Sequence, residues 1–417
     1  MSSVLAYTSP ARGHLFPLVP ILDELARRGD RVSVRTLPSQ LGLLRARGFE
    51  AEPISPEIEA IDLDDWKARA PQGAFKRSVG IFGARAEYEV ADLERAIDEA
   101  QPDLLLIDVQ TWGAAAVAES SGLPWAIWCP YPLPIPSRDA PPFGPGLRPA
   151  RGPLGRLRDA ALSRLFVGSA ERLVGKSLDP IRARLDLPPF SGTAEMFAAP
   201  PLLLYLTAEP FEYPRSDWPA NVRMVGPMSW DPPAEEPVWL GELEEPIVLV
   251  STSSEFQDDG RLVEVALEAL AGEDLTVVAT LPAADLPRAR VPANARVERF
   301  VPHGPLLKRA ACAVTHGGMG VTQKALAASV PVCAVPFGRD QLEVARRVQV
   351  SGAGSRLPAS RLNAKRLRRK VLDAMARRPE AERIAAAFEA AGGAPAAGDA
   401  VEGLLDLTAS VSPDLRA

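Results

Sequence analysis

Short apolar runs alternate with amphipathic runs along most of the chain, and this alternation constrains the fold more than any other feature. In the first half we expect helices at 17–28, 85–100 and 114–121, and strands at 4–7, 32–34, 104–107 and 125–129. Strands separated by helices of about ten residues form βαβ units, in which the strands are parallel and covered on both faces. The sequence therefore predicts an α/β fold built on parallel sheets.

The second half of the chain repeats this alternation. We expect its helices at 262–270, 319–328 and 341–350, and its strands at 247–250, 275–279, 297–300, 311–315 and 332–335. A proline-rich segment, 231–237, separates the halves and is typical of an interdomain linker. We predict two Rossmann-like domains that face each other across a cleft, divided into an N-terminal domain (1–215), a linker (216–240), a C-terminal domain (241–395) and a helical tail (396–417).

Composition narrows the classes of function. The 417 residues carry a net charge of −6 and contain no basic block, which argues against nucleic acid as a partner. No apolar run reaches the length of about 18 residues that a membrane span needs, and the first residues lack the features of a signal peptide. The three cysteines, Cys129, Cys312 and Cys333, lie in apolar runs and form no CxxC pair, so we expect reduced thiols and a cytoplasmic location.

Two polar residues follow expected strands of the first half. His14 comes shortly after 4–7, and Asp108 comes directly after 104–107. Because parallel strands end at the same edge of a sheet, both side chains should emerge there, where a carboxylate would stabilise the imidazolium formed on proton abstraction. Each residue also has a plainer interpretation, His14 as a satisfied polar group near a helix start and Asp108 as a helix cap. Together they favour a catalytic pair.

The strongest local signal is the run Thr315-His316-Gly317-Gly318-Met319-Gly320, where an expected strand meets a helix. Glycines let the backbone approach a ligand closely, and a helix start offers free N–H groups and the positive end of the helix dipole. We predict a diphosphate site with His316 as an added donor. The alternative is a glycine turn with a purely structural role. The GxGxxG, GxxxxGK and HExxH motifs do not occur in the sequence.

Asp340 and Gln341 follow the expected strand 332–335. A carboxylate beside a carboxamide suits a pair of sugar hydroxyls, because the two side chains offer both acceptors and donors of hydrogen bonds. The alternative is that Asp340 simply caps the helix expected from residue 341.

With these motifs in place, the chain resembles the family 1 (GT-B) glycosyltransferases, and most closely the actinomycete enzymes that glycosylate macrolides and other natural products. The resemblance covers nearly the whole chain, including Gly13-His14. It implies an inverting, metal-independent transfer of a sugar from a dTDP- or UDP-sugar to a hydroxyl of a small hydrophobic acceptor (a polyketide, macrolide or aromatic aglycone), with no further cofactor. It rests above all on three motifs: Val301-Pro302-His303, His316-Gly317-Gly318-Met319-Gly320 and Pro336-Phe337-Gly338-Arg339-Asp340-Gln341.

The resemblance also implies a role for each matching residue. His14 would be the general base, and Asp108 would be its partner. Residues of the second half would bind the donor: Phe300 and Val301 at the base, Ser254 near the phosphates, His316, Gly318, Gly320, Val321 and Thr322 around the pyrophosphate, and Asp340 and Gln341 at the sugar hydroxyls. No metal ligand is implied.

Position 324 departs from the family pattern. Many relatives have Glu eight residues after the motif histidine, where it binds the ribose hydroxyls, whereas this chain has Lys324. An ammonium group only donates hydrogen bonds. It would donate to the remaining 3′-oxygen of a deoxyribose, or it would point to solvent and have no role. The change therefore favours a dTDP-sugar over a UDP-sugar.

Two other functions are compatible with the same motifs. A nucleotide-sugar epimerase of the same fold would need acid–base carboxylates in the cleft and no acceptor pocket. An inactive partner protein would have no need of His14, Asp108 and the phosphate motif. The proline-rich stretch 129–153 and the segment 55–85 are the parts expected to face an acceptor. The aromatic residues that favour an acceptor pocket are Trp125, Trp128, Tyr131 and Phe143.

Overall fold

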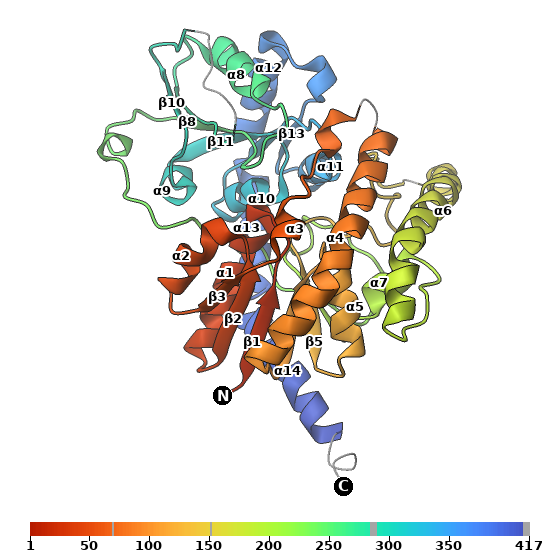
Figure 1. The fold of residues 1–417 in the computed structure, drawn as a ribbon. Coiled ribbons are helices and arrows are strands. Elements are labelled where there is room, and N and C mark those ends of the chain that lie inside the picture. The colour runs from red at the N-terminus through yellow and green to blue at the C-terminus, as the bar shows by residue number, and fades with distance from the viewer. Residues whose placement is uncertain (69–70, 151, 284–289, 412–417) are drawn as a thin grey trace.

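The computed structural model describes residues 1–68, 71–150, 152–283 and 290–411. Within these residues the chain forms two parallel β-sheets, each covered by helices (Figure 1). Strands from the first half make one sheet, and strands from the second half make the other. We call each sheet with its helices the first unit and the second unit. The predicted two-domain α/β fold is confirmed.

The sheet of the first unit has seven described strands in the order β3-β2-β1-β4-β5-β6-β7. The strands are β1 (Ser3–Tyr7), β2 (Arg31–Thr36), β3 (Glu50–Pro53), β4 (Leu104–Asp108), β5 (Trp125–Cys129), β6 (Leu202–Tyr205) and β7 (Val222–Met224). The helices are α1 (Arg12–Arg27), α2 (Leu41–Arg45), α3 (Pro56–Glu59), α4 (Pro71–Ala100), α5 (Trp112–Ser120), α6 (Pro153–Arg184) and α7 (Thr193–Ala198). The edge strands β3 and β7 escaped prediction because they are short and carry charged residues.

Helix α1 begins at Arg12, so the predicted start at Pro17 is wrong and His14 lies in the first turn of the helix. Pro17 and Pro20 lie inside α1, where each removes one backbone hydrogen bond. With the clash of its ring against the preceding turn, each proline costs about 3 kcal/mol, whereas burial of one Leu or Ile side chain contributes about 1.5–3 kcal/mol. The buried apolar face therefore outweighs the two prolines. It consists of Leu15, Leu18, Val19, Ile21, Leu22 and Leu25.

Helix α4 begins at Pro71, well before the predicted start at residue 85, and α6 was not predicted at all. The two helices pack together through Gly83 of α4, where a Cβ atom would lie 2.7 Å from the Cβ of Ser177 in α6. A glycine allows this close approach, although its low helix propensity obscures the pattern in the sequence. Tertiary packing thus extends α4 beyond what its local sequence favours.

The sheet of the second unit has six described strands in the order β10-β9-β8-β11-β12-β13. The strands are β8 (Ile247–Ser251), β9 (Thr276–Thr280), β10 (Ala295–Glu298), β11 (Ala310–Thr315), β12 (Val332–Ala334) and β13 (Gly354–Arg356). The helices are α8 (Arg261–Leu270), α9 (His303–Leu307), α10 (Met319–Ala327), α11 (Gln341–Ser351), α12 (Ala364–Met375), α13 (Arg378–Ala390) and α14 (Gly393–Val411). The strands expected in this half are present within a few residues of their predicted bounds.

The last helix, α14, runs back along the first unit (Figure 1). Ala397 and Val401 of α14 join the core formed by α1 and the first sheet. Arg28, at the end of α1, forms ion pairs with Asp399 at 2.8 Å and with Glu402 at 2.6 Å. The segment predicted as a helical tail is therefore helical up to residue 411 and packs against the first unit through residues between 397 and 405, and 412–417 lie outside the described residues.

Residues 130–150 follow β5 as an irregular segment. Residues 231–237, which also have no helix or strand, lie between β7 of the first unit and β8 of the second. In the described part of the chain, no helix combines the length and apolar character needed to cross a membrane.

Candidate active site

The His14 and Asp108 side chains meet at one edge of the first sheet. β1 and β4 are parallel neighbours, with Tyr7 opposite Ile107, so both strands end at this edge. His14 lies in the first turn of α1, and Asp108 is the last residue of β4. The Nδ1 atom of His14 is 2.8 Å from Oδ1 of Asp108. The expected contact between the two side chains is confirmed.

Further hydrogen bonds hold the Asp108 carboxylate in place. Its Oδ2 atom accepts hydrogen bonds from the N–H and the hydroxyl of Ser9, at 3.0 and 2.7 Å, and its Oδ1 atom accepts one from the N–H of Gln110 at 3.0 Å. The next helix, α5, has Thr111 at its N-cap, so Asp108 is not the simple helix cap of the alternative interpretation. A fixed carboxylate orients the imidazole and leaves Nε2 of His14 as the nitrogen available for proton transfer.

Burial and charge act in opposite directions on this pair. Burial lowers the pKa of His14, but the charge of Asp108 and its hydrogen bond outweigh burial and raise the pKa above 6.5. Burial raises the pKa of Asp108, but the interaction with His14 and the hydrogen bonds hold that pKa below its usual value. Glu255 and Asp340 of the second unit also raise the pKa of His14, so the second unit faces the pair.

The glycine-rich run lies at an edge of the second sheet, between β11 and α10. Gly317 has φ +87°, a left-handed conformation that favours glycine. A Cβ atom at Gly318 would lie 2.3 Å from Nε2 of His316, because the imidazole folds against this residue. The turn and the histidine therefore both require glycine, and the run ends where α10 begins at Met319.

His316 is buried beside the start of α10. Among the described residues, its Nδ1 atom makes no hydrogen bond of normal geometry, and the ring makes a polar contact with the Ser251 backbone, which weakly raises its pKa. Burial lowers the pKa of His316 below 6.5, so the imidazole is neutral at pH 7. Most buried polar atoms have a partner, and the first N–H groups of a helix lack one inside the helix. The arrangement is suited to receive the oxygens of an anionic ligand.

The other residues predicted to bind a donor follow strands of the same parallel sheet and therefore gather at the same edge. Ser254 follows β8 and is exposed, and Val301, which is buried, follows β10. The Phe300 side chain is 50% exposed and available for stacking. In α10, Gly320 is exposed and Val321 is half-buried. Thr322 is buried, with its hydroxyl 3.4 Å from that of Thr315.

Asp340 and Gln341 are adjacent in sequence but differ in their contacts. Burial raises the pKa of Asp340 to about 6, and its carboxylate interacts with the charge of His14. The Gln341 carboxamide makes three hydrogen bonds within the protein. Its Oε1 atom accepts hydrogen bonds from the N–H groups of Phe337 and Gly338, and its Nε2 atom donates to Gln257 at 2.6 Å. Gln341 thus fixes the turn that presents Asp340.

The Lys324 side chain is not turned to solvent. Its ammonium group donates to the carbonyl of Trp230 and to Oδ1 of Asp231, both at 2.6 Å. Asp231 belongs to the linker, and its Oδ2 atom accepts a hydrogen bond from the N–H of Gly304 at 2.9 Å. Lys324 therefore ties the linker to α10, a role that neither alternative from the sequence included.

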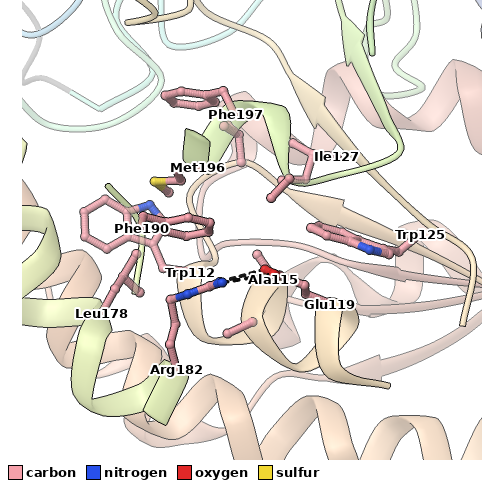
Figure 2. A pocket seen from close by; sticks show the side chains of 13 residues that line it. Trp112, Ala115, Glu119, Trp125, Ile127, Leu178, Arg182, Phe190, Met196 and Phe197 are labelled. Carbon is pink, nitrogen blue, oxygen red and sulfur yellow. Dashed lines mark hydrogen bonds and ion pairs between the residues drawn. The ribbon is translucent and has the colours of Figure 1, made fainter. Parts of the chain in front are cut away.

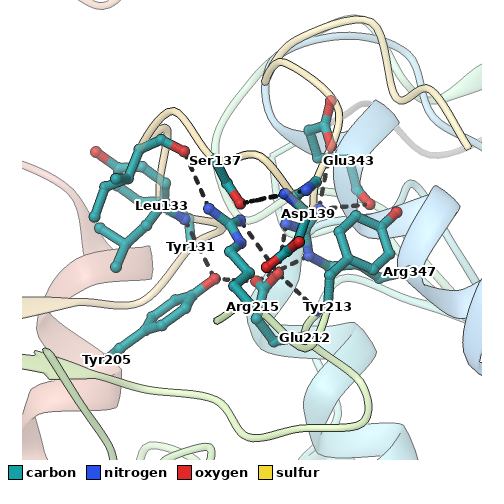
Figure 3. A network of polar contacts seen from close by, with 12 residues as sticks. Tyr131, Leu133, Ser137, Asp139, Tyr205, Glu212, Tyr213, Arg215, Glu343 and Arg347 are labelled. Carbon is teal, nitrogen blue, oxygen red and sulfur yellow. Dashed lines mark hydrogen bonds and ion pairs between the residues drawn. The ribbon is translucent and has the colours of Figure 1, made fainter. Parts of the chain in front are cut away.

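A buried ion-pair network joins the two units (Figure 3). The Arg347 guanidinium of α11 donates to both carboxylate oxygens of Glu212, at 2.8 and 2.9 Å, and lies 3.1 Å from Glu343. Glu343 also accepts hydrogen bonds from the N–H groups of Gly144 and Gly146 in the proline-rich segment, at 2.8 Å each. Burial raises the pKa of Glu212, but Arg347 outweighs this and holds the pKa below its usual value. Sequence reasoning missed this network.

The tryptophans expected at an acceptor pocket lie elsewhere. Trp125, together with Ile127 and Phe197, lines a cavity in the first unit (Figure 2). The volume of this cavity is about 20 Å³, which leaves room for one water at most. Trp128 is fully buried in the core. Both side chains belong to the packed strand β5, so the assignment of these two residues to an acceptor pocket is wrong. Tyr131, in contrast, lies beside His14, with ring centroids 5.6 Å apart.

Two facing α/β units, with a His–Asp pair at one sheet edge and a glycine-rich helix start at the other, define a glycosyltransferase of the GT-B class. Among the described residues, no three His, Cys, Asp or Glu side chains are grouped to hold a metal ion. The comparisons with known proteins agree with this class.

Residues 264–405 match the family described as the erythromycin biosynthesis protein CIII-like C-terminal domain. The chain is 34% identical over 424 residues to 4'-demethylrebeccamycin synthase from Lentzea aerocolonigenes, which covers 96% of this chain and 99% of that protein. It is 31% identical to a PGL/p-HBAD biosynthesis rhamnosyltransferase of Mycobacterium tuberculosis (strain ATCC 25177 / H37Ra), over 72% of this chain and 67% of that protein.

Solved structures share the fold. The kitacinnamycin glycosyltransferase has a TM-score of 0.77 at 22% identity, over 97% of this chain and 99% of that chain. Glycosyltransferase VinC, solved in complex with DTDP, has a TM-score of 0.70 at 22% identity, over 98% of this chain and 100% of that chain. The protein belongs to the family 1 glycosyltransferases of natural-product biosynthesis.

Proposed function

We propose that this enzyme transfers a sugar from a dTDP- or UDP-sugar to a hydroxyl of a small hydrophobic natural-product acceptor, with inversion and without a metal ion. One observation carries the proposal. The His14–Asp108 pair lies at an edge of the first sheet, and the charge of Asp340, from the donor edge of the second sheet, acts on it. The base and the sugar-binding carboxylate of the proposed reaction would therefore face each other.

His14 would act on the acceptor. Its Nε2 atom takes the proton of the acceptor hydroxyl while that oxygen attacks C1 of the sugar, and Asp108 stabilises the imidazolium that forms. The new bond forms as the bond from C1 to the phosphate oxygen breaks, so the nucleoside diphosphate leaves with the electron pair. A single displacement of this kind inverts C1, through a transition state with oxocarbenium character.

The start of α10 and His316 would act on the leaving group. Negative charge develops on the diphosphate as the bond breaks, and the helix N–H groups and the neutral imidazole lie in place to stabilise it. These fixed dipoles supply the stabilisation that a metal ion provides in other enzymes, which supports metal independence. Ser254, Gly318, Gly320, Val321 and Thr322 would complete the phosphate site.

The remaining donor contacts follow from exposure and chemistry. The half-exposed ring of Phe300 would stack on the nucleobase, and the backbone of Val301 would meet its edge. Asp340 would accept a hydrogen bond from a sugar hydroxyl, and Gln341, which also holds the turn, would donate its second Nε2 hydrogen to a neighbouring hydroxyl. The DTDP complex of VinC supports a dTDP-sugar donor. The three cysteines are buried and unpaired, which supports a reducing, cytoplasmic location.

The proposal is tested by replacing His14 with alanine. Because a general base contributes about 10²–10⁴-fold, we expect His14→Ala to lower kcat on an alcohol acceptor by about that factor. Calorimetry should give a Kd for the nucleoside diphosphate within about twofold of the wild type, because His14 lies in the other unit. Near wild-type turnover by His14→Ala would contradict the base assignment. Loss of wild-type activity in EDTA, restored by a divalent ion, would contradict metal independence.

A further inference from the structure

A second ion pair spans the two units, and it involves the segment 55–85. Asp65 lies in the short turn Asp65–Lys67 of the first unit and is buried. Its carboxylate accepts three hydrogen bonds from Arg339 of the second unit, two from Nε at 3.1 Å and one from Nη2 at 2.9 Å. An arginine held at both carboxylate oxygens has its orientation fixed as well as its position.

Two further contacts occur at the same place. The Nη1 atom of Arg339 lies 3.6 Å from Oε2 of Glu255, in the loop after β8. The ring of Trp66 packs edge-to-face on that of Phe256, with centroids 5.1 Å apart. Trp66 and Phe256 are exposed, whereas the Glu212–Arg347 pair is buried on both sides. The contacts around Asp65 thus form a latch between the units, bordered by two exposed aromatic rings and separate from the Glu212–Arg347 network.

The latch acts next to Asp340. Arg339 has φ +53°, a left-handed backbone conformation that few residues other than glycine adopt. Such a conformation persists where the surrounding contacts hold it. The contacts of the Arg339 side chain with Asp65 and Glu255 supply this restraint, and the residue that follows is Asp340, whose charge reaches His14.

We propose that Asp65 is a positioning residue for sugar transfer. By holding Arg339 from the opposite unit, it fixes Asp340 opposite His14 and couples use of the donor sugar to the acceptor-side segment 55–85. The inference rests on the proposed roles of His14 and Asp340. Asp65 should affect transfer of the sugar and not binding of the nucleotide, because Asp340, the residue that it positions, would meet the sugar hydroxyls.

The test compares Asp65→Asn with a matched control. The control is Glu119→Gln. Glu119 also accepts two hydrogen bonds from one arginine, Arg182, at 2.6 and 3.0 Å, but both residues belong to the first unit. We expect Asp65→Asn to lower kcat/KM for the nucleotide sugar about tenfold, with the Kd of the nucleoside diphosphate within about twofold of the wild type. Glu119→Gln should change both quantities less than twofold.

Arg339→Asn is a second variant, in case Asp65→Asn does not fold. Asparagine tolerates a positive φ, so this variant removes the guanidinium without adding backbone strain and should show the same kinetic split. Asp65→Asn kinetics equal to those of Glu119→Gln, or nucleotide binding weakened as much as kcat/KM, would overturn the inference. If Asp340→Asn alone lowers kcat/KM, the positioning role fails and the proposed function stands. Unchanged turnover in both Asp340→Asn and His14→Ala would overturn the proposed function and this inference together.

Discussion

The two facing sheet edges follow the same βαβ plan but differ in how their polar groups are satisfied. At the first edge, Asp108 is bonded to Ser9, Gln110 and His14, so the pair is held in place by the protein alone. At the second edge, the Nδ1 atom of His316 makes no hydrogen bond of normal geometry to described residues, its ring making a polar contact with the Ser251 backbone, and the Phe300 ring is half exposed. The first edge is prepared for proton transfer, and a ligand would complete the second.

The buried network around Glu212 and Arg347 holds the two edges opposite each other. Its disruption should therefore have the largest effect that we predict. Glu212→Ala would leave the Arg347 guanidinium buried without its main partner. We expect a loss of about 3–5 kcal/mol in the free energy of unfolding, measured by urea denaturation. Glu402→Ala breaks a partly exposed ion pair with Arg28, which keeps Glu24 and Asp399 as partners, and should cost about 1 kcal/mol. Equal losses in the two variants would contradict the role of the network.

His316→Ala separates the second edge from the first. The variant loses a neutral donor to a charged diphosphate, which contributes about 1–3 kcal/mol. Calorimetry should therefore give a Kd for the nucleoside diphosphate roughly 5–150-fold weaker than that of the wild type. An unchanged Kd would show that the ligand does not complete this edge through His316.

The choice of nucleotide is the smallest effect that we predict. Lys324 lies at the position where the family resemblance implies a ribose-binding Glu, and its ammonium group donates hydrogen bonds to Asp231 and Trp230. Because position 324 offers no carboxylate to bind a 2′-hydroxyl, dTDP should bind no worse than UDP. Titration of the wild-type enzyme with both nucleotides measures this. A UDP Kd tenfold lower, about 1.4 kcal/mol, would contradict the prediction and leave the enzyme class unaffected.

The sequence predicted what local patterns encode. Alternating runs identified both sheets, and the positions of His14 and Asp108 after parallel strands predicted that their side chains meet. The glycine run identified the turn before α10. The latch and the buried network were missed because Asp65 and Arg339 are 274 residues apart, and Glu212 and Arg347 are 135 apart. A charged residue carries no local sign of a distant partner.

The same reason explains why the two tryptophans were misassigned. Gln341 also makes contacts that the sequence does not reveal, with Phe337, Gly338 and Gln257, and its role as a sugar ligand stays a prediction. Trp125 and Trp128 lie next to a proline-rich segment in sequence, yet strand packing buries them. Residue type and position relative to a motif therefore predict chemistry, and the contacts decide whether that chemistry is free to act.

The central claim is that Asp108 prepares His14 as a base, and the pH dependence of kcat/KM tests it most directly. Only neutral His14 accepts a proton, and its pKa lies above 6.5, so kcat/KM of the wild type should rise with pH to a midpoint above 6.5. In Asp108→Asn the charge that raises the pKa is lost while burial still lowers it. The midpoint should therefore move to lower pH, and kcat should fall.

The titration of Asp340 has to be distinguished from that of His14 in this measurement, because burial raises the pKa of Asp340 to about 6. The Asp340→Asn variant should keep a rise with pH, with a midpoint displaced less than in Asp108→Asn, because Asp108 is the stronger influence on His14. A wild-type midpoint above 6.5 that falls on removal of the Asp108 charge is the predicted result. A midpoint that Asp108→Asn leaves in place would contradict the account.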